Sequence, residues 1–159
     1  MANHQKERKR LQAAYGHLYS RYFAEAMPGS FGCFYCAEPA DTIDHCPPLS
    51  WVEHRRPQDW KRDKIAFHTI VCCRDCNKVL GDRGLFTALS RTTLIRQKLE
   101  TKYEREAALW SEEEIAQMSP RFQKSIRARS SLLRMLVERI RAAQWREMVE
   151  ADAEQARSV

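Results

Sequence analysis

The sequence predicts an α+β fold that is mostly α-helical, and three observations carry that prediction. Apolar residues recur at helical spacing near the N-terminus and again from Leu85 onward. All six cysteines fall between residues 31 and 84. The same segment contains a β-rich stretch, residues 65–71. The 159 residues are therefore expected to form an N-terminal helix (1–30), a small cysteine-rich core (31–84) and a C-terminal helical region (85–159).

The N-terminal helix is expected to run from about Gln5 to Ala26, where Met27-Pro28-Gly29 ends it. Its apolar residues recur every three or four positions and are Leu11, Tyr15, Leu18, Tyr22 and Ala26. Its first turns carry four basic residues, which are Lys6, Arg8, Lys9 and Arg10. Such a cluster either lies against phosphates or forms a solvated helix face, and the solvated face is the more common case.

The elements expected inside the cysteine-rich segment are short. Residues 50–64 contain three arginines, two lysines and two tryptophans, which suits a polar loop or a short helix. Residues 65–71 alternate weakly between apolar and polar side chains and are expected to form a strand. A further helix is expected to begin at Asn77 and to include Leu80, directly after the last cysteine.

Three helices are expected in the C-terminal region. The first runs from Leu85 to about Leu109 with the apolar stripe Leu85, Leu89, Thr92 or Thr93, Arg96, Leu99 and Tyr103. Ser111 and Glu114 match a capping box that begins the second helix. Ser119-Pro120 marks a third start, because proline is tolerated in the first helical turn.

The last helix is expected to be long and to reach about Ala153. Its apolar residues follow the helical period and are Phe122, Ile126, Leu133, Leu136, Val137, Ile140 and Met148. Such a stripe must be buried. The expected cover is the first two helices, a second copy of the chain, or another protein partner.

Composition limits the class of protein. Hydrophobic residues make up 43% of the chain and charged residues 30%, which suits a very soluble protein with a modest core. The sequence shows no apolar run long enough to cross a bilayer and no signal peptide at its N-terminus, so a cytoplasmic protein without a membrane role is expected. The net charge of +6 indicates either a polyanionic partner such as nucleic acid or simple solubility.

Two Cys-x-x-Cys pairs predict a zinc site. Cys33 and Cys36 form the first pair, and Cys73 and Cys76 form the second. In a reducing compartment such cysteines are more plausible as metal ligands than as disulfides. Four thiolates leave zinc no open coordination position, so this zinc is expected to be structural.

The remaining two cysteines, Cys46 and Cys72, are expected to be small buried hydrophobic residues. Cys72 is also an alternative to its neighbour Cys73 as a ligand, although the spacing to Cys76 favours Cys73.

The order of these motifs resembles the HNH endonuclease family, which has a ββα-metal fold. The resemblance covers about Gly32 to Arg83 and involves eight positions, which are Cys33, Cys36, Asp44, His45, His68, Cys73, Cys76 and Asn77. The segment Leu80-Gly81-Asp82 followed by a helix is similar to small phage and bacterial members. The expected fold is thus a zinc-stapled ββα-metal core with one N-terminal helix and several C-terminal helices.

The resemblance implies metal-dependent hydrolysis of phosphodiester bonds in DNA. In that reading His45 is the general base that deprotonates the attacking water, a role that suits a histidine titrating near neutrality. Asp44 and Asn77 bind a catalytic Mg²⁺ or Mn²⁺ through oxygen atoms. His68 takes the family position that orients the general base or its loop through a hydrogen bond.

Two departures keep a second reading open. Many family members carry a further His or Asn one helical turn after the position of Asn77, where this chain has Gly81, with Asp82 adjacent. Many also carry a lysine three residues after that position, where this chain has Leu80. The alternative is a catalytically degenerate, zinc-stabilised module that binds nucleic acid or protein.

Basic residues near these motifs are the expected DNA contacts. Arg74 and Lys78 flank the second cysteine pair. Further candidates lie between the two halves of the motif and are Arg55, Arg56, Lys61 and Arg62. They alternate with Trp51 and Trp60, which suit either a core position or a stacking platform for bases.

Overall fold

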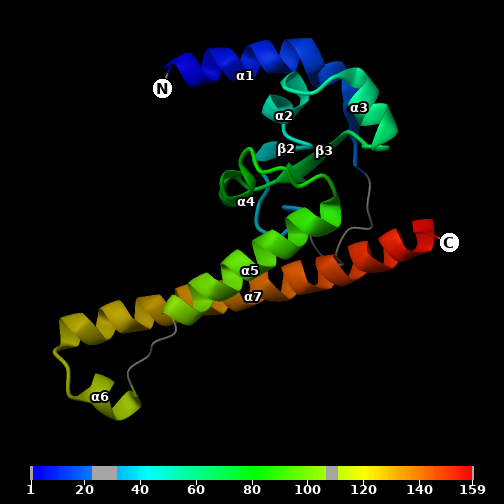
Figure 1. Ribbon diagram of the computed structural model, residues 1–159. Coiled ribbons are helices and arrows are strands. Elements are labelled where there is room, and N and C mark those ends of the chain that lie inside the picture. Colours follow the sequence, from blue (N-terminus) through cyan, green and yellow to red (C-terminus); the bar gives the residue numbers. More distant parts are fainter. Residues whose placement is uncertain (1, 23–31, 107–110, 159) are drawn as a thin grey trace.

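The computed structural model describes residues 2–22, 32–106 and 111–158 (Figure 1). It is an α+β fold that is mostly α-helical, as predicted. A small sheet with short helices lies at one end of the molecule, and two long helices run side by side beneath it (Figure 1). The helices are α1 (Ala2–Tyr15), α2 (Leu49–Glu53), α3 (Pro57–Arg62), α4 (Arg74–Leu80), α5 (Ala88–Glu106), α6 (Glu112–Ala116) and α7 (Pro120–Ser158), with a 3₁₀ turn η1 (Gly16–Leu18).

The sheet has three strands in the order β1-β3-β2, with bounds β1 (Ser20–Arg21), β2 (Thr42–Cys46) and β3 (His68–Cys72). β2 and β3 are antiparallel, and His45 lies opposite Thr69 in this pair. Side chains alternate between the two faces of a strand. Asp44 and Cys46 therefore share the face that is buried against the rest of the molecule, whereas Ile43, 47% exposed, lies on the outer face with His45.

One hydrophobic core joins the sheet to the long helices. α5 and α7 run antiparallel (Figure 1) and pack closely along their length. Ile95 and Leu99 of α5 and Leu136 and Ala143 of α7 are buried in the same cluster as the cysteines and Ile70 of β3. The middle part of the predicted apolar stripe of the last helix is thus covered within the chain, by α5. No helix among the described residues is both long and apolar enough to span a bilayer.

The N-terminal helix is shorter than predicted. α1 ends at Tyr15, and the chain then turns through η1 into β1, which pairs in parallel with β3. Strand pairing thus overrides the helical spacing of the apolar residues. Tyr22 packs against Phe34 of the core instead of continuing a helix stripe. The predicted end of the helix, 26–29, lies outside the described residues.

Several other elements match the expectations with shifted bounds. The predicted strand 65–71 is β3, which begins at His68, and the polar segment 50–64 forms the two short helices α2 and α3. α4 begins at Arg74, earlier than the predicted Asn77. The capping box at Ser111 is present, with both of its hydrogen bonds.

The long helices differ from the predicted stripes in detail. α7 extends to Ser158, and Phe122 and Met148 are 48% and 57% exposed. The apolar stripe therefore covers only the middle of α7. The buried face of α5 consists of Ala88, Arg91, Thr92, Ile95 and Leu99. This face includes Arg91, which is not part of the predicted stripe.

Candidate metal centre and surrounding residues

Cys33, Cys36, Cys73 and Cys76 form one buried cluster. Their four Sγ atoms lie within 4.8 Å of one another. The Sγ of Cys36 is 3.7 Å from that of Cys73 and 3.5 Å from that of Cys76. Four thiolates around a metal at the zinc–sulfur distance of about 2.3 Å would be about 3.8 Å apart. The donor set and its spacing therefore fit a tetrahedral metal ion.

Two turns of the backbone present these thiols. In the first, the amide of Ala37 donates to the carbonyl of Cys33 at 2.9 Å, and Ala37 has a left-handed φ of 60°. Gly32 is needed beside this turn, because a Cβ there would collide with the carbonyl oxygens of Ala37 and Glu38. In the second, Cys73 is the N-cap of α4, and its Sγ accepts a hydrogen bond from the amide of Cys76 at 3.4 Å.

The cluster lies between the sheet and α7. The amide of Phe34 donates to the carbonyl of Val71 at 3.0 Å, which ties the first turn to β3. Arg139 of α7 lies beside the thiols of Cys36 and Cys76 and forms an ion pair of 3.6 Å with Asp75. A cation at this place offsets the negative charge that four thiolates around a divalent ion would carry.

Cys46 and Cys72 are buried outside the cluster, as expected for small hydrophobic residues. Burial raises the pKa of the Cys46 thiol to about 11, and it also raises the pKa of Cys72. Both thiols are therefore neutral at pH 7. The choice between Cys72 and Cys73 as the ligand is decided in favour of Cys73.

Asp44 is the residue whose surroundings differ most from the prediction. Both of its carboxylate oxygens accept hydrogen bonds from Nη1 of Arg91, at 2.7 and 2.8 Å. Oδ2 also accepts a hydrogen bond of 2.7 Å from the hydroxyl of Tyr35. Asp44 is 3% exposed and Arg91 is fully buried. Held in this way, the carboxylate is not open to a divalent metal.

The side chain of Asn77 is hydrogen-bonded to the first residues of β2. Its Nδ2 donates to Oγ1 of Thr42 at 3.1 Å and to the carbonyl of Ile43 at 3.2 Å. These bonds join α4 to the edge of β2. As arranged in this structure, Asp44 and Asn77 do not fit a shared Mg²⁺ or Mn²⁺ ion, and the catalytic metal stays a prediction.

His45 occupies the opposite face of β2 and is half-buried. The ring of Tyr19 meets it edge-on, with 4.9 Å between ring centroids. Burial lowers the pKa of His45; Asp44 opposes this shift, and Arg8 and Arg91 add to it. His45 is therefore neutral at pH 7, which is the state that a general base requires.

His68 is not beside His45. It lies opposite Cys46 in the β2–β3 pair, on the face that Asp44 also occupies. The ring of Tyr22 is 4.9 Å away, and the buried Nδ1 of His68 has no hydrogen-bond partner among the described residues. The pleat thus separates the two histidines, and a direct contact by which His68 would orient His45 is not present.

The predicted DNA contacts lie at the surface. Arg74 forms an exposed ion pair of 2.9 Å with Asp41, and Lys78 is exposed on the same helix. Arg55 stacks on the ring of Trp51, with the guanidinium 5.4 Å from the ring centroid. Exposed basic residues on α3 and before it are Arg56, Lys61 and Arg62.

Sequence reasoning missed three residues of the site, namely Arg91, Tyr35 and Tyr19. Arg91 carried a signal, because an arginine at helical spacing from Ala88 and Ile95 on a buried face needs a buried acidic partner. Tyr35 lies between the first two cysteines, where a buried hydroxyl also needs an acceptor. Tyr19 carried no comparable signal, since its contact with His45 depends on how the N-terminal segment folds over the sheet.

No family model, curated protein or solved structure matches this chain. The resemblance to the HNH family therefore depends on the motif positions. Of these, the four-cysteine cluster is the part for which the structure provides direct support.

Proposed function

We propose that this protein is a zinc-stapled endonuclease of the HNH type that hydrolyses phosphodiester bonds in DNA. One observation carries the proposal. The strands β2 and β3 are antiparallel, α4 follows β3 directly, and a cluster of four thiols joins the start of α4 to the turn that precedes β2. This order of elements is what the motif resemblance implies. Zinc is the metal proposed for the cluster, because it prefers four thiolates in a tetrahedron.

His45 is the residue proposed for the chemistry. A neutral imidazole accepts a proton from water, and the resulting hydroxide attacks the phosphorus atom. The bond from phosphorus to the 3′ oxygen then breaks, and solvent protonates the departing oxygen. Tyr19 fixes the ring plane of His45 through its edge-on contact. No step is assigned to a divalent metal at Asp44, since that carboxylate is held by Arg91.

A cleavage assay tests the proposal. Zinc-loaded protein is incubated with supercoiled plasmid and Mg²⁺ or Mn²⁺, and wild type is compared with His45→Ala. His54→Ala is the matched control, because His54 is an exposed histidine at the end of α2. Wild type and the control are expected to cut the plasmid, whereas His45→Ala should lose at least about a hundredfold in rate. Equal rates for all three proteins would refute the proposed role of His45.

A second candidate function is a non-cleaving module that binds nucleic acid. The buried pair of Asp44 and Arg91 favours this candidate, because it occupies the carboxylate that the family uses for metal. DNA binding without cleavage in either metal, at protein concentrations that saturate the plasmid, would support the second candidate and exclude the first.

A further inference from the structure

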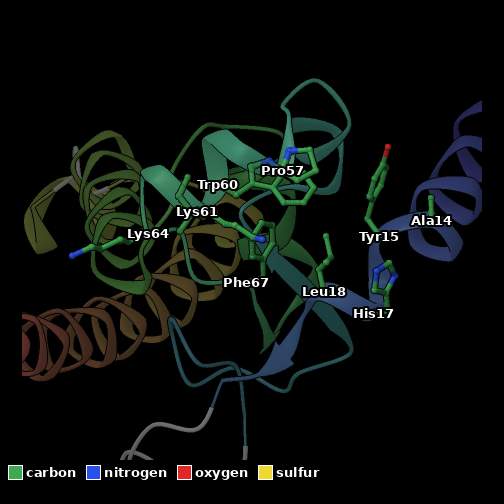
Figure 2. Close-up of a pocket in the computed structure, with 10 residues that line it drawn as sticks. Ala14, Tyr15, His17, Leu18, Pro57, Trp60, Lys61, Lys64 and Phe67 are labelled. Carbon is green, nitrogen blue, oxygen red and sulfur yellow. The ribbon is translucent and has the colours of Figure 1, made fainter.

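An open groove lies between the N-terminal segment and α3, away from the cysteine cluster (Figure 2). Its volume is about 590 Å³, within the range of sites that hold small ligands. One wall comes from α1 and η1 and includes Tyr15, His17 and Leu18. The other comes from α3 and the residues beside it and includes Pro57, Trp60 and Lys61. Phe67 lies between the two walls (Figure 2).

Three aromatic residues are part of the groove lining. Tyr15, Trp60 and Phe67 all border the groove, and Trp60 meets Phe67 with 5.4 Å between ring centroids. Ring surfaces of this kind are the platforms on which proteins stack the flat faces of unpaired bases. Stacking of this kind tolerates any base, because every base has a π face.

The α3 side of the groove is positively charged. Lys61 and Lys64 both line the groove and are exposed. The acidic residues nearby, Asp59 and Asp63, form ion pairs with Arg62. Figure 2 shows Lys61 next to Trp60, whereas the ammonium of Lys64 is directed away from the other labelled residues. Phosphates complement this charge, whereas an apolar peptide would not.

The groove also connects to the proposed catalytic residue. The ring of Tyr19 makes edge-on contacts with the rings of both His45 and Phe67, at ring-centroid distances of 4.9 and 5.4 Å. One aromatic ring therefore separates His45 from the groove lining. We propose that the groove binds one unpaired base of a DNA strand, with the adjoining phosphates on Lys61 and Lys64. This inference rests on the proposed function, which supplies DNA as the ligand.

A binding assay without cleavage tests the groove. Zinc-loaded full-length protein, with no other divalent metal added, is titrated into a fluorescent single-stranded thymidine oligonucleotide. The same backbone carrying abasic residues is the second probe. Wild type is expected to bind the thymidine strand more tightly than the abasic strand. Trp60→Leu should weaken binding to the thymidine strand at least about fivefold and leave the abasic strand unchanged.

The charge on the rim is tested by Lys61→Gln, an exposed substitution that does not disturb packing. Each lost phosphate contact on a single strand lowers the slope of log affinity against log salt by about 0.7, and this decrease is expected for Lys61→Gln. Matched controls are Trp145→Leu on α7, also half-buried, and Lys98→Gln on α5, also exposed. Both controls should bind within about twofold of wild type.

Two results would overturn the inference. One is equal affinity of wild type for the thymidine and abasic strands, which would mean that the groove takes no base. The other is an unchanged affinity in both Trp60→Leu and Lys61→Gln. Because binding is measured without cleavage, loss of the proposed nuclease activity alone leaves the groove assignment standing.

Discussion

Asp44, which the sequence predicts as a metal ligand, forms a buried ion pair in the structure. Its carboxylate is buried with the guanidinium of Arg91, and the Tyr35 hydroxyl satisfies a further acceptor site. Charges taken out of water are tolerated only when they are paired and hydrogen-bonded. This pair ties β2 to α5, two elements that are far apart in the sequence.

Removing one partner of this pair should cost much stability. Arg91→Met leaves the Asp44 charge buried without its cation, so the free energy of unfolding is expected to fall by about 3–5 kcal/mol in a urea titration. Arg74→Met breaks an ion pair whose arginine side chain is 83% exposed, and it should change stability by less than about 1 kcal/mol. A double variant, Asp44→Leu with Arg91→Met, should recover most of the loss. Similar costs for the Arg91 and Arg74 variants would contradict the structural role of Asp44.

The pKa of His45 gives a second prediction at this scale. Burial holds this pKa below the ordinary value of 6.5, so the unfolded chain binds more protons than the folded chain near and below pH 6.5. The stability that neutral His45 contributes is therefore present above pH 6.5 and is lost as the pH falls through the folded pKa. The melting temperature of wild type minus that of His45→Gln should decrease from pH 7.5 to pH 5.

His54→Gln is the control for this pH series, because His54 is an exposed histidine. Taking differences between variants removes the effect of acid on the metal cluster, which all of them share. If the difference in melting temperature between wild type and His45→Gln does not change with pH, burial does not lower the pKa of His45.

Gly81 also has a structural explanation at the residue scale. It ends α4 with a φ of 50° and a ψ of −141°, a conformation that favours glycine. A side chain in the family's position for a further ligand would strain this turn. The departure from the family pattern therefore follows from the way α4 stops and the chain turns toward α5.

At the scale of elements, the cysteine cluster joins two short pieces of structure. One is the turn that contains Cys33 and Cys36, and the other is α4, a helix of only seven residues. Short elements of this kind bury little apolar area and depend on a metal or on packing for stability. The N-cap role of Cys73 shows that the same residue organises the helix and the metal cluster.

Removing one ligand should therefore release the metal. Cys36→Ala is expected to lose the bound zinc and the order of β2, β3 and α4, because binding free energy and folding free energy are linked in such sites. Cys46→Ala is the matched control, since Cys46 is buried in the same core outside the cluster. Elemental analysis should find one zinc per chain in wild type and in Cys46→Ala. A full zinc content in Cys36→Ala would refute the cluster as a metal site.

At the scale of the whole molecule, one core spans the metal cluster, the sheet and the two long helices. Cys76, Leu80, Ile95 and Leu136 belong to a single buried cluster. The cysteine-rich segment (31–84) and the C-terminal helical region (85–159) thus both contribute to this cluster. Arg139 adds a polar link between α7 and the cysteines.

A shared core predicts one cooperative unfolding transition. Helix content from far-UV circular dichroism reports chiefly on α5 and α7, whereas tryptophan fluorescence of the double variant Trp110→Phe with Trp145→Phe reports on Trp51 and Trp60, which lie between β2 and β3 in the sequence. The two melting curves should coincide for the zinc-loaded protein. Removal of zinc with a chelator should lower both midpoints together. Two separate transitions would mean that α5 and α7 are stable without the sheet.

The sequence by itself determined the mixed fold class, the cysteine cluster, the strand after residue 65 and the capped helix starts. These features depend on local spacing, which a one-dimensional pattern records directly: two thiols per turn, a capping serine, an alternating strand. The end of α1 was not determined locally, because the pairing of β1 with β3 overrides the periodicity of the N-terminal segment.

Only the tertiary structure decided where the side chains of Asp44, His45 and His68 lie and what they contact. The strand pleat places the two histidines on opposite faces, and the partner of Asp44 comes from a helix 47 residues further along the chain. Such contacts depend on which elements pack together, and sequence spacing carries no record of that. The aromatic groove likewise lies between residues of α1 and η1 on one side and residues of α3 on the other, and no motif connects the two sides.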